Sequence, residues 1–402
     1  MLRFLTAGES HGQSLVTILE GMPAGLTIDI AALNVELKRR QGGYGRGRRM
    51  AIESDRAQVL SGVRYGLTTG GPIALLIPNK DWENWQRTMA VEGPPAASTP
   101  GAERPAVTRP RPGHADLAGA VKYDHHDIRN VLERASARET AARVAVGAIA
   151  RQLLGRLDTE IVSHVASLGR ASIADPLGVS YDDVLRIPAD SALHCVDPVV
   201  ERLMIAEIDA ARDNGDTMGG SFEVIVRGVP VGLGSHVQWD RKLDGRLAQA
   251  LMSIPAIKAV GIGRGPGVAA LPGSRIHDEI LPWSGVPPSG HLPVSRPTNN
   301  AGGLEGGITN GEDLRVSAYM KPIATLMKPL RSVDLETLDL SPAAIERSDV
   351  CAVPAAAVVG EAMVAFVLAE AAIEKFGGDS IAEMLANWHA FRAHIDARFA
   401  RA

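Results

Sequence analysis

The chain has 402 residues, of which 45% are hydrophobic and 22% charged, so it is long enough to bury a sizeable core. Its formal net charge of −4 argues against a surface that binds nucleic acid as a whole, and its two cysteines exclude a dense disulfide framework. No Gly/Ser-rich or charge-rich tract divides the chain, so residues 1–402 are interpreted as one large domain. The N-terminal residues lack the apolar stretch of a signal peptide, which together with the cysteine count favours the cytoplasm.

The first part of the chain predicts two strands and one helix. Residues 14–19 are expected to form the first strand, with residues 8–12 as the turn before it. Asp29 can cap a helix that runs to about Arg40, because basic side chains gather where that helix would end. Residues 71–78 are rich in Ile and Leu and predict a buried strand.

The middle of the chain predicts a long loop, a buried helix and two further strands. Residues 81–112 are Pro-rich and aperiodic, which is typical of a functional or mobile loop. Residues 139–154 are apolar on most of a helical circumference and predict a buried helix. Apolar and polar side chains alternate in residues 222–227 and 314–320, which predicts half-buried strands. Strands of this kind mixed with buried helices favour an α/β architecture with helices between sheets.

Residues 358–376 form the most apolar segment of the chain. Glu361, Glu370 and Glu374 interrupt it, so it predicts a buried helix and not a membrane span. Residues 387–402 are polar and predict a helical, peripheral C-terminal tail.

A first candidate site combines arginines with glycines. The arginines are Arg39, Arg40, Arg46, Arg48 and Arg49, and four glycines lie among them. Arginine forks bind carboxylate and phosphate through paired hydrogen bonds, and glycine lets the backbone approach an anion. Two interpretations remain open, namely a site for a small anion and a solvated basic loop that faces RNA.

A second candidate is the histidine of the segment RPRPGHAD at residues 109–116. His114 follows Gly113 and precedes Asp116 by two positions. A histidine beside a carboxylate can titrate near neutral pH and move a proton. The alternative is a structural histidine in a loop.

A third candidate lies just before the helix predicted at residues 139–154. Ser136 and Glu139 have the spacing of a capping box, which is a sufficient structural explanation for those two residues. A capping box does not explain why Arg134 and Arg138 also lie at the start of this predicted helix. Free N–H groups and arginines together favour an anion pocket there.

Two weaker candidates follow. Residues 299–307 contain four glycines in six positions, which implies close contact with a ligand or a tight crossing of chains. Residues 320–325 and 347–349 place basic residues near a carboxylate, which could also be a surface ion pair. His125 and His126 have no neighbours at the spacing of a zinc site, and no dinucleotide-binding fingerprint is present.

Taken in order, these segments resemble the chorismate synthase family from Gly8 to about Asp379. The matching segments are GESHG at 8–12, RPGHAD at 111–116, RASARETAARVAVGAIA at 134–150, GDTMGG at 215–220, NNAGGLEGGITNG at 299–311, MKPIATL at 320–326 and RSDVCAVPA at 347–355. The resemblance implies an α/β (α+β) fold, namely a β-α-β sandwich with helices packed between antiparallel sheets, assembled as a homotetramer.

The resemblance also implies a reaction. It is the anti-1,4-elimination of phosphate from 5-enolpyruvylshikimate 3-phosphate to give chorismate, the last step of the shikimate pathway that leads to aromatic amino acids. The implied cofactor is reduced FMN, which lends electron density as phosphate leaves and ends the reaction reduced. NADPH is the implied electron source, acting directly or through an external flavin reductase.

Residue roles follow from the matched motifs in the same way. His11 is implied to protonate or stabilise the departing phosphate, and His114 to keep the reduced flavin correctly protonated. Ser10 and Asp349 are implied to help the flavin N5 region take the C6 proton. The implied FMN contacts are Arg134, Ala135, Ser136, Pro255, Ala256, Gly306, Lys321, Pro322, Ile323, Ala324, Thr325 and Arg347. The residues implied to contact substrate or a nicotinamide-nucleotide phosphate are Arg39, Arg40, Arg46, Arg48 and Arg129.

The chain departs from the family pattern at Pro255, where members carry an amide side chain. A proline donates no hydrogen bond, so a flavin contact there has to come from Ala256 or from a carbonyl group. The main rival function is a flavin-dependent NAD(P)H oxidoreductase, against which the missing dinucleotide fingerprint argues. A non-catalytic anion- or RNA-binding protein is the second rival, and the net acidity argues against it; no nucleic-acid or membrane partner is expected.

Overall fold

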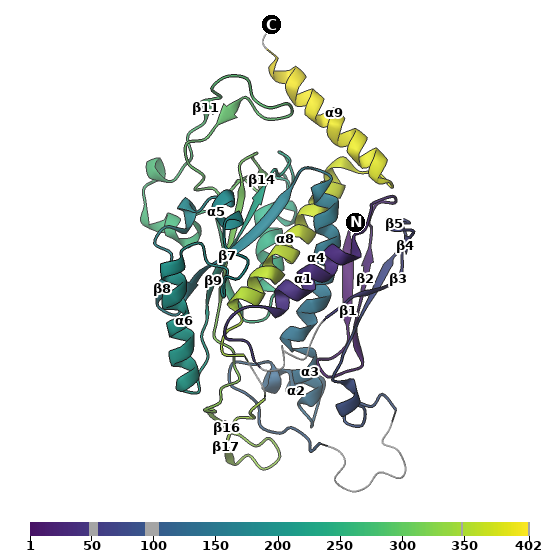
Figure 1. Cartoon of the computed structure of the whole chain (residues 1–402), viewed down its shortest axis with the longest axis vertical. Coiled ribbons are helices and arrows are strands. Elements are labelled where there is room, and N and C mark those ends of the chain that lie inside the picture. The colour runs from purple at the N-terminus through teal and green to yellow at the C-terminus, as the bar shows by residue number, and fades with distance from the viewer. Residues whose placement is uncertain (48–54, 93–103, 347–348, 401–402) are drawn as a thin grey trace.

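The computed structural model describes residues 1–47, 55–92, 104–346 and 349–400. Three layers form its core, namely two antiparallel sheets with long helices between them (Figure 1). The predicted α/β sandwich with helices between antiparallel sheets is therefore confirmed.

The smaller sheet has four strands in the order β1-β2-β6-β3, all antiparallel. They are β1 (Arg3–Ala7), β2 (Ser14–Glu20), β6 (Ile73–Pro78) and β3 (Gln58–Ser61). The strands predicted at residues 14–19 and 71–78 are confirmed, but β1 precedes the strand that was expected to come first. β1 is a short edge strand with no fully buried residue, so it lacks the apolar face by which a strand is recognised in sequence.

The larger sheet has five antiparallel strands in the order β10-β15-β9-β7-β8. They are β10 (Ile257–Ile262), β15 (Leu314–Met320), β9 (Gly220–Arg227), β7 (Glu160–Leu168) and β8 (Ala171–Ser172).

Three helices fill the space between the sheets (Figure 1). They are α1 (Ile30–Gln41), α4 (Thr140–Gly155) and α8 (Val353–Phe376). The Asp29 carboxylate caps α1 as predicted, because it accepts a hydrogen bond from the Ala32 N–H at 3.0 Å. The helices predicted at residues 139–154 and 358–376 correspond to α4 and α8.

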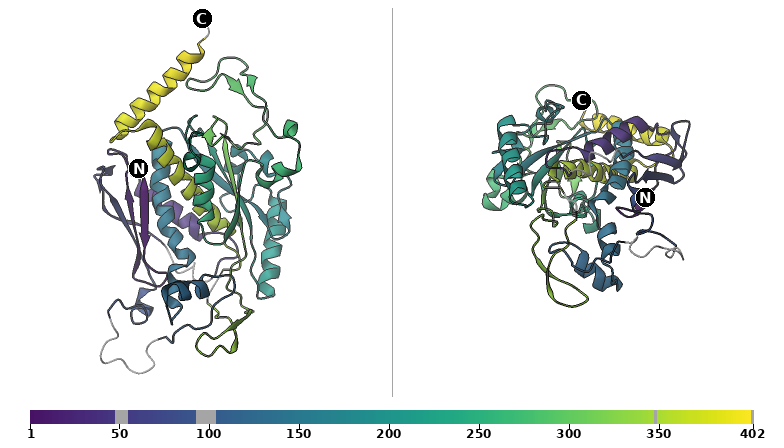
Figure 2. Two further views of the ribbon diagram at one scale, coloured as in Figure 1. Left: turned by 180° about the vertical axis from the view of Figure 1, so that it is seen from behind. Right: turned by 60° about the horizontal axis from the view of Figure 1, so that its bottom comes forward.

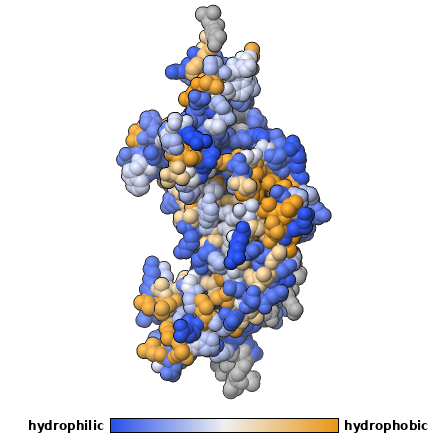
Figure 3. Space-filling view, turned by 90° about the vertical axis from the view of Figure 1, so that its left-hand side faces the viewer, coloured by the Kyte–Doolittle hydropathy of each residue, from blue (hydrophilic) through white to orange (hydrophobic). Residues whose placement is uncertain are grey.

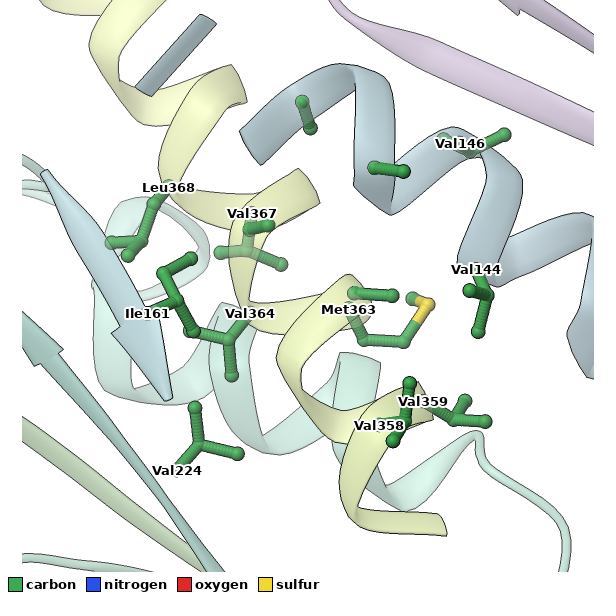
Figure 4. Close-up of a cluster of buried hydrophobic side chains, with 14 of the residues drawn as sticks. Val144, Val146, Ile161, Val224, Val358, Val359, Met363, Val364, Val367 and Leu368 are labelled. Carbon is green, nitrogen blue, oxygen red and sulfur yellow. The ribbon is translucent and has the colours of Figure 1, made fainter. Parts of the chain in front are cut away.

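Glycine lets these central helices approach their neighbours closely. A Cβ atom built on Gly147 of α4 would lie 2.3 Å from the Ala362 Cβ on α8, which is too close for any side chain. A Cβ on Gly360 would lie 2.4 Å from the ring of Phe222 on β9. Around these contacts Val144 of α4 and Val359 and Met363 of α8 lie together in the hydrophobic core between the two helices (Figure 4). The helix α8 is long and apolar enough to span a membrane, but 83% of its apolar window is buried in the protein, so it is a core helix.

The prediction that residues 222–227 form a half-buried strand is wrong, because both faces of β9 are covered. On the outer face Ile225 packs with Tyr181 and Val184 of α5 (Tyr181–Leu185). Glu223 on the same face is also buried, where it bonds to Arg315 at 2.7 Å. The alternation of polar and apolar residues therefore reflects a buried ion pair and not contact with water.

The remaining elements surround this sandwich. The helix α6 (Pro198–Asp213) lies on the outer side of the larger sheet, whereas α7 (Leu243–Met252) packs against α8 and β10. Two short helices, α2 (Asp116–Tyr123) and α3 (Arg129–Arg134), lie at one end of the molecule (Figure 1). Two-stranded ribbons pair β4 (Val63–Arg64) with β5 (Leu67–Thr68), β11 (Leu281–Pro282) with β12 (Val294–Ser295), β13 (Leu304–Glu305) with β14 (Ile308–Thr309), and β16 (Arg331–Val333) with β17 (Leu340–Pro342). The side that carries α5 and α6 mixes hydrophilic residues with apolar patches (Figure 3).

The C-terminal helix α9 (Ile381–Phe399) projects from the end opposite α2 and α3 (Figure 2). It begins at Ile381, ahead of the tail that was predicted from residue 387. Trp388 and Ile395 are buried, so the helix is peripheral in place but attached through an apolar face.

Candidate active site

Most of the predicted site residues come together at the end of the sandwich that carries α2 and α3 (Figure 2). The loop between β1 and β2, the start of α4 and the loop after β15 all reach this end. Each contributes residues from a different part of the sequence, and hydrogen bonds between side chains and backbone join them.

His11 lies in the β1–β2 loop and is held from two sides. Its Nδ1 lies 2.8 Å and 2.9 Å from the two carboxylate oxygens of Glu133 on α3. Its ring stacks on the indole of Trp85, with 3.7 Å between the ring centroids. The Glu133 carbonyl also accepts a hydrogen bond from the backbone N–H of Ser10 at 3.1 Å. The loop that carries Ser10 and His11 is therefore fixed on α3.

His114 forms a second histidine–carboxylate pair in the segment before α2. Its Nδ1 lies 2.5 Å from the Asp116 carboxylate, which also receives the Arg111 guanidinium at 2.8 Å. Burial alone would raise the pKa of Asp116, but hydrogen bonds from His114 and Arg111 outweigh it and hold that pKa well below its usual range. An ionised Asp116 only accepts hydrogen bonds, so Nδ1 of His114 is the donor in this pair, although the Arg111 guanidinium also lies 3.0 Å from the same nitrogen.

The loop after β15 faces this pair. The Lys321 ammonium donates to the Gly113 carbonyl at 2.8 Å, and Arg111 donates to the Thr325 hydroxyl at 2.9 Å. The Ile323 carbonyl accepts a hydrogen bond from Thr217 at 2.7 Å, so the loop that also contains Pro322 and Ala324 is fixed along its length. Burial lowers the pKa of Lys321, and the nearby Lys258 adds to the effect.

The turn between α7 and β10 joins the same loop. The Ala256 carbonyl accepts the Lys321 N–H at 2.9 Å, and Ala256 has a φ of 69°, in the left-handed region that non-glycine residues rarely adopt. Pro255 lies beside it and is half-buried. Ser253 in this turn accepts a hydrogen bond from Arg143 of α4 at 2.7 Å.

Arg134 at the end of α3 fixes the β1–β2 loop from below. Its guanidinium donates to the carbonyl groups of Thr6 at 2.9 Å and Gly8 at 3.0 Å. Ala135 and Ser136 connect this arginine to the start of α4. The expected capping box is not formed, because Ser136 accepts from the Arg138 N–H at 3.3 Å and Glu139 receives the Thr6 hydroxyl at 2.8 Å.

A buried cluster of arginines lies next to the start of α4. Asp55 bonds to Arg40 at 2.8 Å and to Arg138 at 2.9 Å, and all three side chains are almost fully buried. Burial is the main reason that the pKa of Arg40 is lowered, although Asp55 opposes the effect. Arg46 pairs with Asp349 at 2.8 Å, and Asp349 also accepts the Gly47 N–H at 2.6 Å. The helix start thus carries a net surplus of positive charge, as an anion site requires.

Three predicted residues lie elsewhere or toward the edge. Arg39 points into the helical layer, where it bonds to Glu361 of α8 at 2.7 Å. Gly306 lies in the turn between β13 and β14, near His236 and toward the opposite end of the molecule (Figure 1). Arg129 lies beside Trp85 and donates to the Pro105 carbonyl at 3.1 Å. Arg48, Arg49 and Arg347 lie outside the described residues.

Three residues of this end were not singled out from the sequence, namely Trp85, Glu133 and Asp55. Trp85 is a buried aromatic residue in a Pro-rich loop, and Glu133 directly precedes the segment RASARET. Either feature could have drawn attention to them. Asp55 has no such signal, because only folding brings it between Arg40 and Arg138. Among the described residues, no group of three His, Cys, Asp or Glu side chains could hold a metal ion.

Comparisons with known proteins identify the family of this chain. The family model for chorismate synthase matches residues 2–373. A chorismate synthase from Desulforamulus reducens is 59% identical over 388 residues, which cover 96% of this chain and 97% of the relative. One from Moorella thermoacetica is 58% identical over 395 residues, which cover 98% of this chain and 99% of the relative.

A solved structure described as the crystal structure of chorismate synthase superposes with a TM-score of 0.77 at 42% sequence identity. It covers 98% of each chain, so the likeness includes both sheets and the helices between them. The match in sequence and in fold spans every element that builds the site. The chain therefore belongs to the chorismate synthase family, whose members are carbon–oxygen lyases that act on phosphates.

Proposed function

We propose that this chain converts 5-enolpyruvylshikimate 3-phosphate to chorismate and phosphate by a 1,4-elimination that requires reduced FMN. The observation that supports this most directly is the pair of histidine–carboxylate contacts, His11 with Glu133 and His114 with Asp116, at the same end of the sandwich as a cluster of arginines. An elimination of phosphate needs proton transfer and anion binding in one place, and this end of the molecule offers both.

The substrate carries two carboxylates and a phosphate, so it requires several cations. Arg46 and Arg134 lie at the edges of the site, and the buried pair Arg40 and Arg138 adds positive charge behind it. Guanidinium groups bind such anions through paired hydrogen bonds. Arg40 is too deeply buried to reach a large ligand without rearrangement, which favours a role for it in the field of the site over direct contact with a nicotinamide nucleotide.

The residues matched to FMN contacts fit a flavin nucleotide in their chemistry. Lys321, Arg134 and the N–H groups at the start of α4 are donors suited to a phosphate group. The residues 321–325, Ala256 and Ser136 bring backbone groups to the same end. When bound, reduced flavin supplies electron density as phosphate leaves, and it ends the reaction still reduced.

The side chains of this chain would then hold and move protons. His11 is proposed to donate a proton to the departing phosphate, and His114 to keep the cofactor in its working protonation state. Ser10 and Asp349 are proposed to assist the loss of the C6 hydrogen. Asp349 is already oriented by Arg46 and by the N–H of Gly47.

The proposal also covers the compartment, the oligomeric state and the electron source of the enzyme. We place it in the cytoplasm as a homotetramer, with NADPH or an external flavin reductase as the source of electrons. Cys195 and Cys351 are free and buried, which fits a reducing compartment.

Release of phosphate under anaerobic conditions tests the proposal. The purified chain is mixed with 5-enolpyruvylshikimate 3-phosphate and either photoreduced FMN, oxidised FMN or NADPH with oxidised FMN. Phosphate and the absorbance of chorismate are expected with photoreduced FMN and not with oxidised FMN alone. Release at the same rate with oxidised FMN would contradict the cofactor requirement, and no release under any condition would contradict the activity. Oxidation of NADPH by FMN without phosphate release would support the rival oxidoreductase.

A further inference from the structure

Glu133 is a buried carboxylate that serves His11 alone among the described residues. Its side chain is fully buried, and its two oxygens accept from the His11 backbone N–H at 2.8 Å and contact the His11 ring Nδ1 at 2.8 Å and 2.9 Å. A buried carboxylate is costly unless its hydrogen bonds and charge are satisfied. Here the backbone and ring of one residue supply those bonds.

The carboxylates of the two histidine–carboxylate pairs differ in their other partners. Asp116 divides its charge between His114 and the Arg111 guanidinium. Glu133 has no arginine or lysine within ion-pair distance in the described part of the chain. Its negative charge therefore faces the His11 imidazole without competition.

The helix α3 holds the β1–β2 loop on both sides of this contact. The Glu133 carbonyl accepts the Ser10 N–H, and the next residue, Arg134, donates to the carbonyl groups of Thr6 and Gly8. Trp85 covers the ring of His11 by stacking. The position of the ring is thus fixed by hydrogen bonds at one edge and by an aromatic face.

We propose that Glu133 is the positioning residue for His11. An ionised carboxylate can only accept, so it fixes the proton of the ring on Nδ1 and leaves Nε2 as the nitrogen that acts on a ligand. When the ring also carries a proton on Nε2, as an acid for a departing phosphate requires, Glu133 still accepts from Nδ1 and leaves the Nε2 proton for the phosphate. The expected effect of Glu133 on turnover rests on the function proposed above. The position of the proton on the His11 ring does not depend on that function.

The first test reads the ring itself. Long-range ¹H–¹⁵N spectra of protein labelled in histidine report which ring nitrogen carries the proton, and the His11 signals are assigned by their loss in His11→Gln. In its neutral form the wild-type ring is expected to carry its proton on Nδ1. In Glu133→Gln the amide offers both a donor and an acceptor to Nδ1, so the other tautomer is expected to gain a measurable share. Identical His11 signals in the two proteins would overturn the proposal.

The second test is a double-mutant cycle on turnover. Glu133→Gln is expected to lower kcat by about 10- to 100-fold, a part of the roughly 10²–10⁴-fold that a positioned acid–base group contributes, with KM little changed. In a His11→Gln background the same change is expected to have almost no further effect, because Glu133 acts through His11. An equal loss in both backgrounds, or a wild-type kcat in Glu133→Gln, would contradict the inference.

Glu223→Gln provides a matched control. Glu223 also forms a buried pair with a histidine, since it lies 3.1 Å from Nε2 of His164, but it is in the outer face of the five-stranded sheet. The folded Glu223→Gln protein is expected to keep wild-type kcat and wild-type His11 signals. If the wild type released no phosphate while the His11 signals behaved as expected, the proposed activity would fail and the positioning role would stand.

Discussion

Replacement of His114 by alanine is expected to lower turnover by roughly 10²-fold or more, the usual contribution of a general acid–base group. The reason lies in its surroundings. Asp116 stays ionised because His114 and Arg111 hold its pKa well below the usual range, so it keeps the proton of the His114 ring on Nδ1 and leaves Nε2 for the proposed role. Alanine removes this nitrogen but leaves Arg111 bonded to Asp116 and Thr325.

Steady-state kinetics with photoreduced FMN measures the loss, and titrations with FMN and substrate check that both still bind. His126→Ala is the matched control, because His126 is an exposed histidine in the loop that follows α2. It is expected to behave as wild type. Wild-type turnover in His114→Ala would remove this residue from the mechanism.

Replacement of Glu361 by alanine is expected to lower the free energy of unfolding by about 3 kcal/mol, as when one partner of a buried ion pair is removed. Glu361 is buried on α8 and accepts from Arg39 at 2.7 Å, Arg151 at 2.8 Å and Ser163 at 2.6 Å. Without the Glu361 carboxylate, the Arg39 and Arg151 guanidinium groups lose the buried negative charge that they share in the helical layer. Their partial contact with solvent keeps the loss at the lower end of the range for buried pairs.

The same group gives this stability a pH dependence. Burial alone would raise the pKa of Glu361, but Arg39, Arg151 and Ser163 outweigh it and lower the pKa to about 2. Because the folded pKa lies below the unfolded value of about 4.3, the contribution is complete above that value and is lost as the pH falls toward 2.

Chemical denaturation at several pH values measures both effects. The difference in stability between wild type and Glu361→Gln is expected to shrink as the pH falls below about 4.5. Glu374→Ala, on the same helix but half exposed, is expected to cost at most about 1 kcal/mol, as surface pairs do. A Glu361→Ala protein as stable as this control would show that the buried network contributes little.

Much of the fold was predictable from local patterns. The cap at Asp29 and the apolar circumference of α4 and α8 are local signals, and the structure confirms the helices they predicted. The edge strand β1 and the covered outer face of β9 were not predicted. Both depend on what packs against a strand, and the alternation along the strand itself does not contain that information.

The site was predictable only as far as its motifs extend. The motifs contain His11 and His114, and the structure shows each beside a carboxylate. Arg39 looked like a member of the same arginine cluster, but it bonds to Glu361, 322 positions away in the chain. Glu133 lies 122 positions from His11, so its contact likewise arises only from the packing of α3 against the β1–β2 loop.

The function proposed for this chain is that of a lyase whose flavin is recycled. The most direct measurement is the number of phosphates released for each reduced FMN in an anaerobic cuvette, with the flavin spectrum recorded before and after. Many phosphates are expected for each flavin, with a spectrum that is still that of the reduced form at the end. One phosphate or fewer for each flavin, with oxidised flavin formed in step, would contradict it.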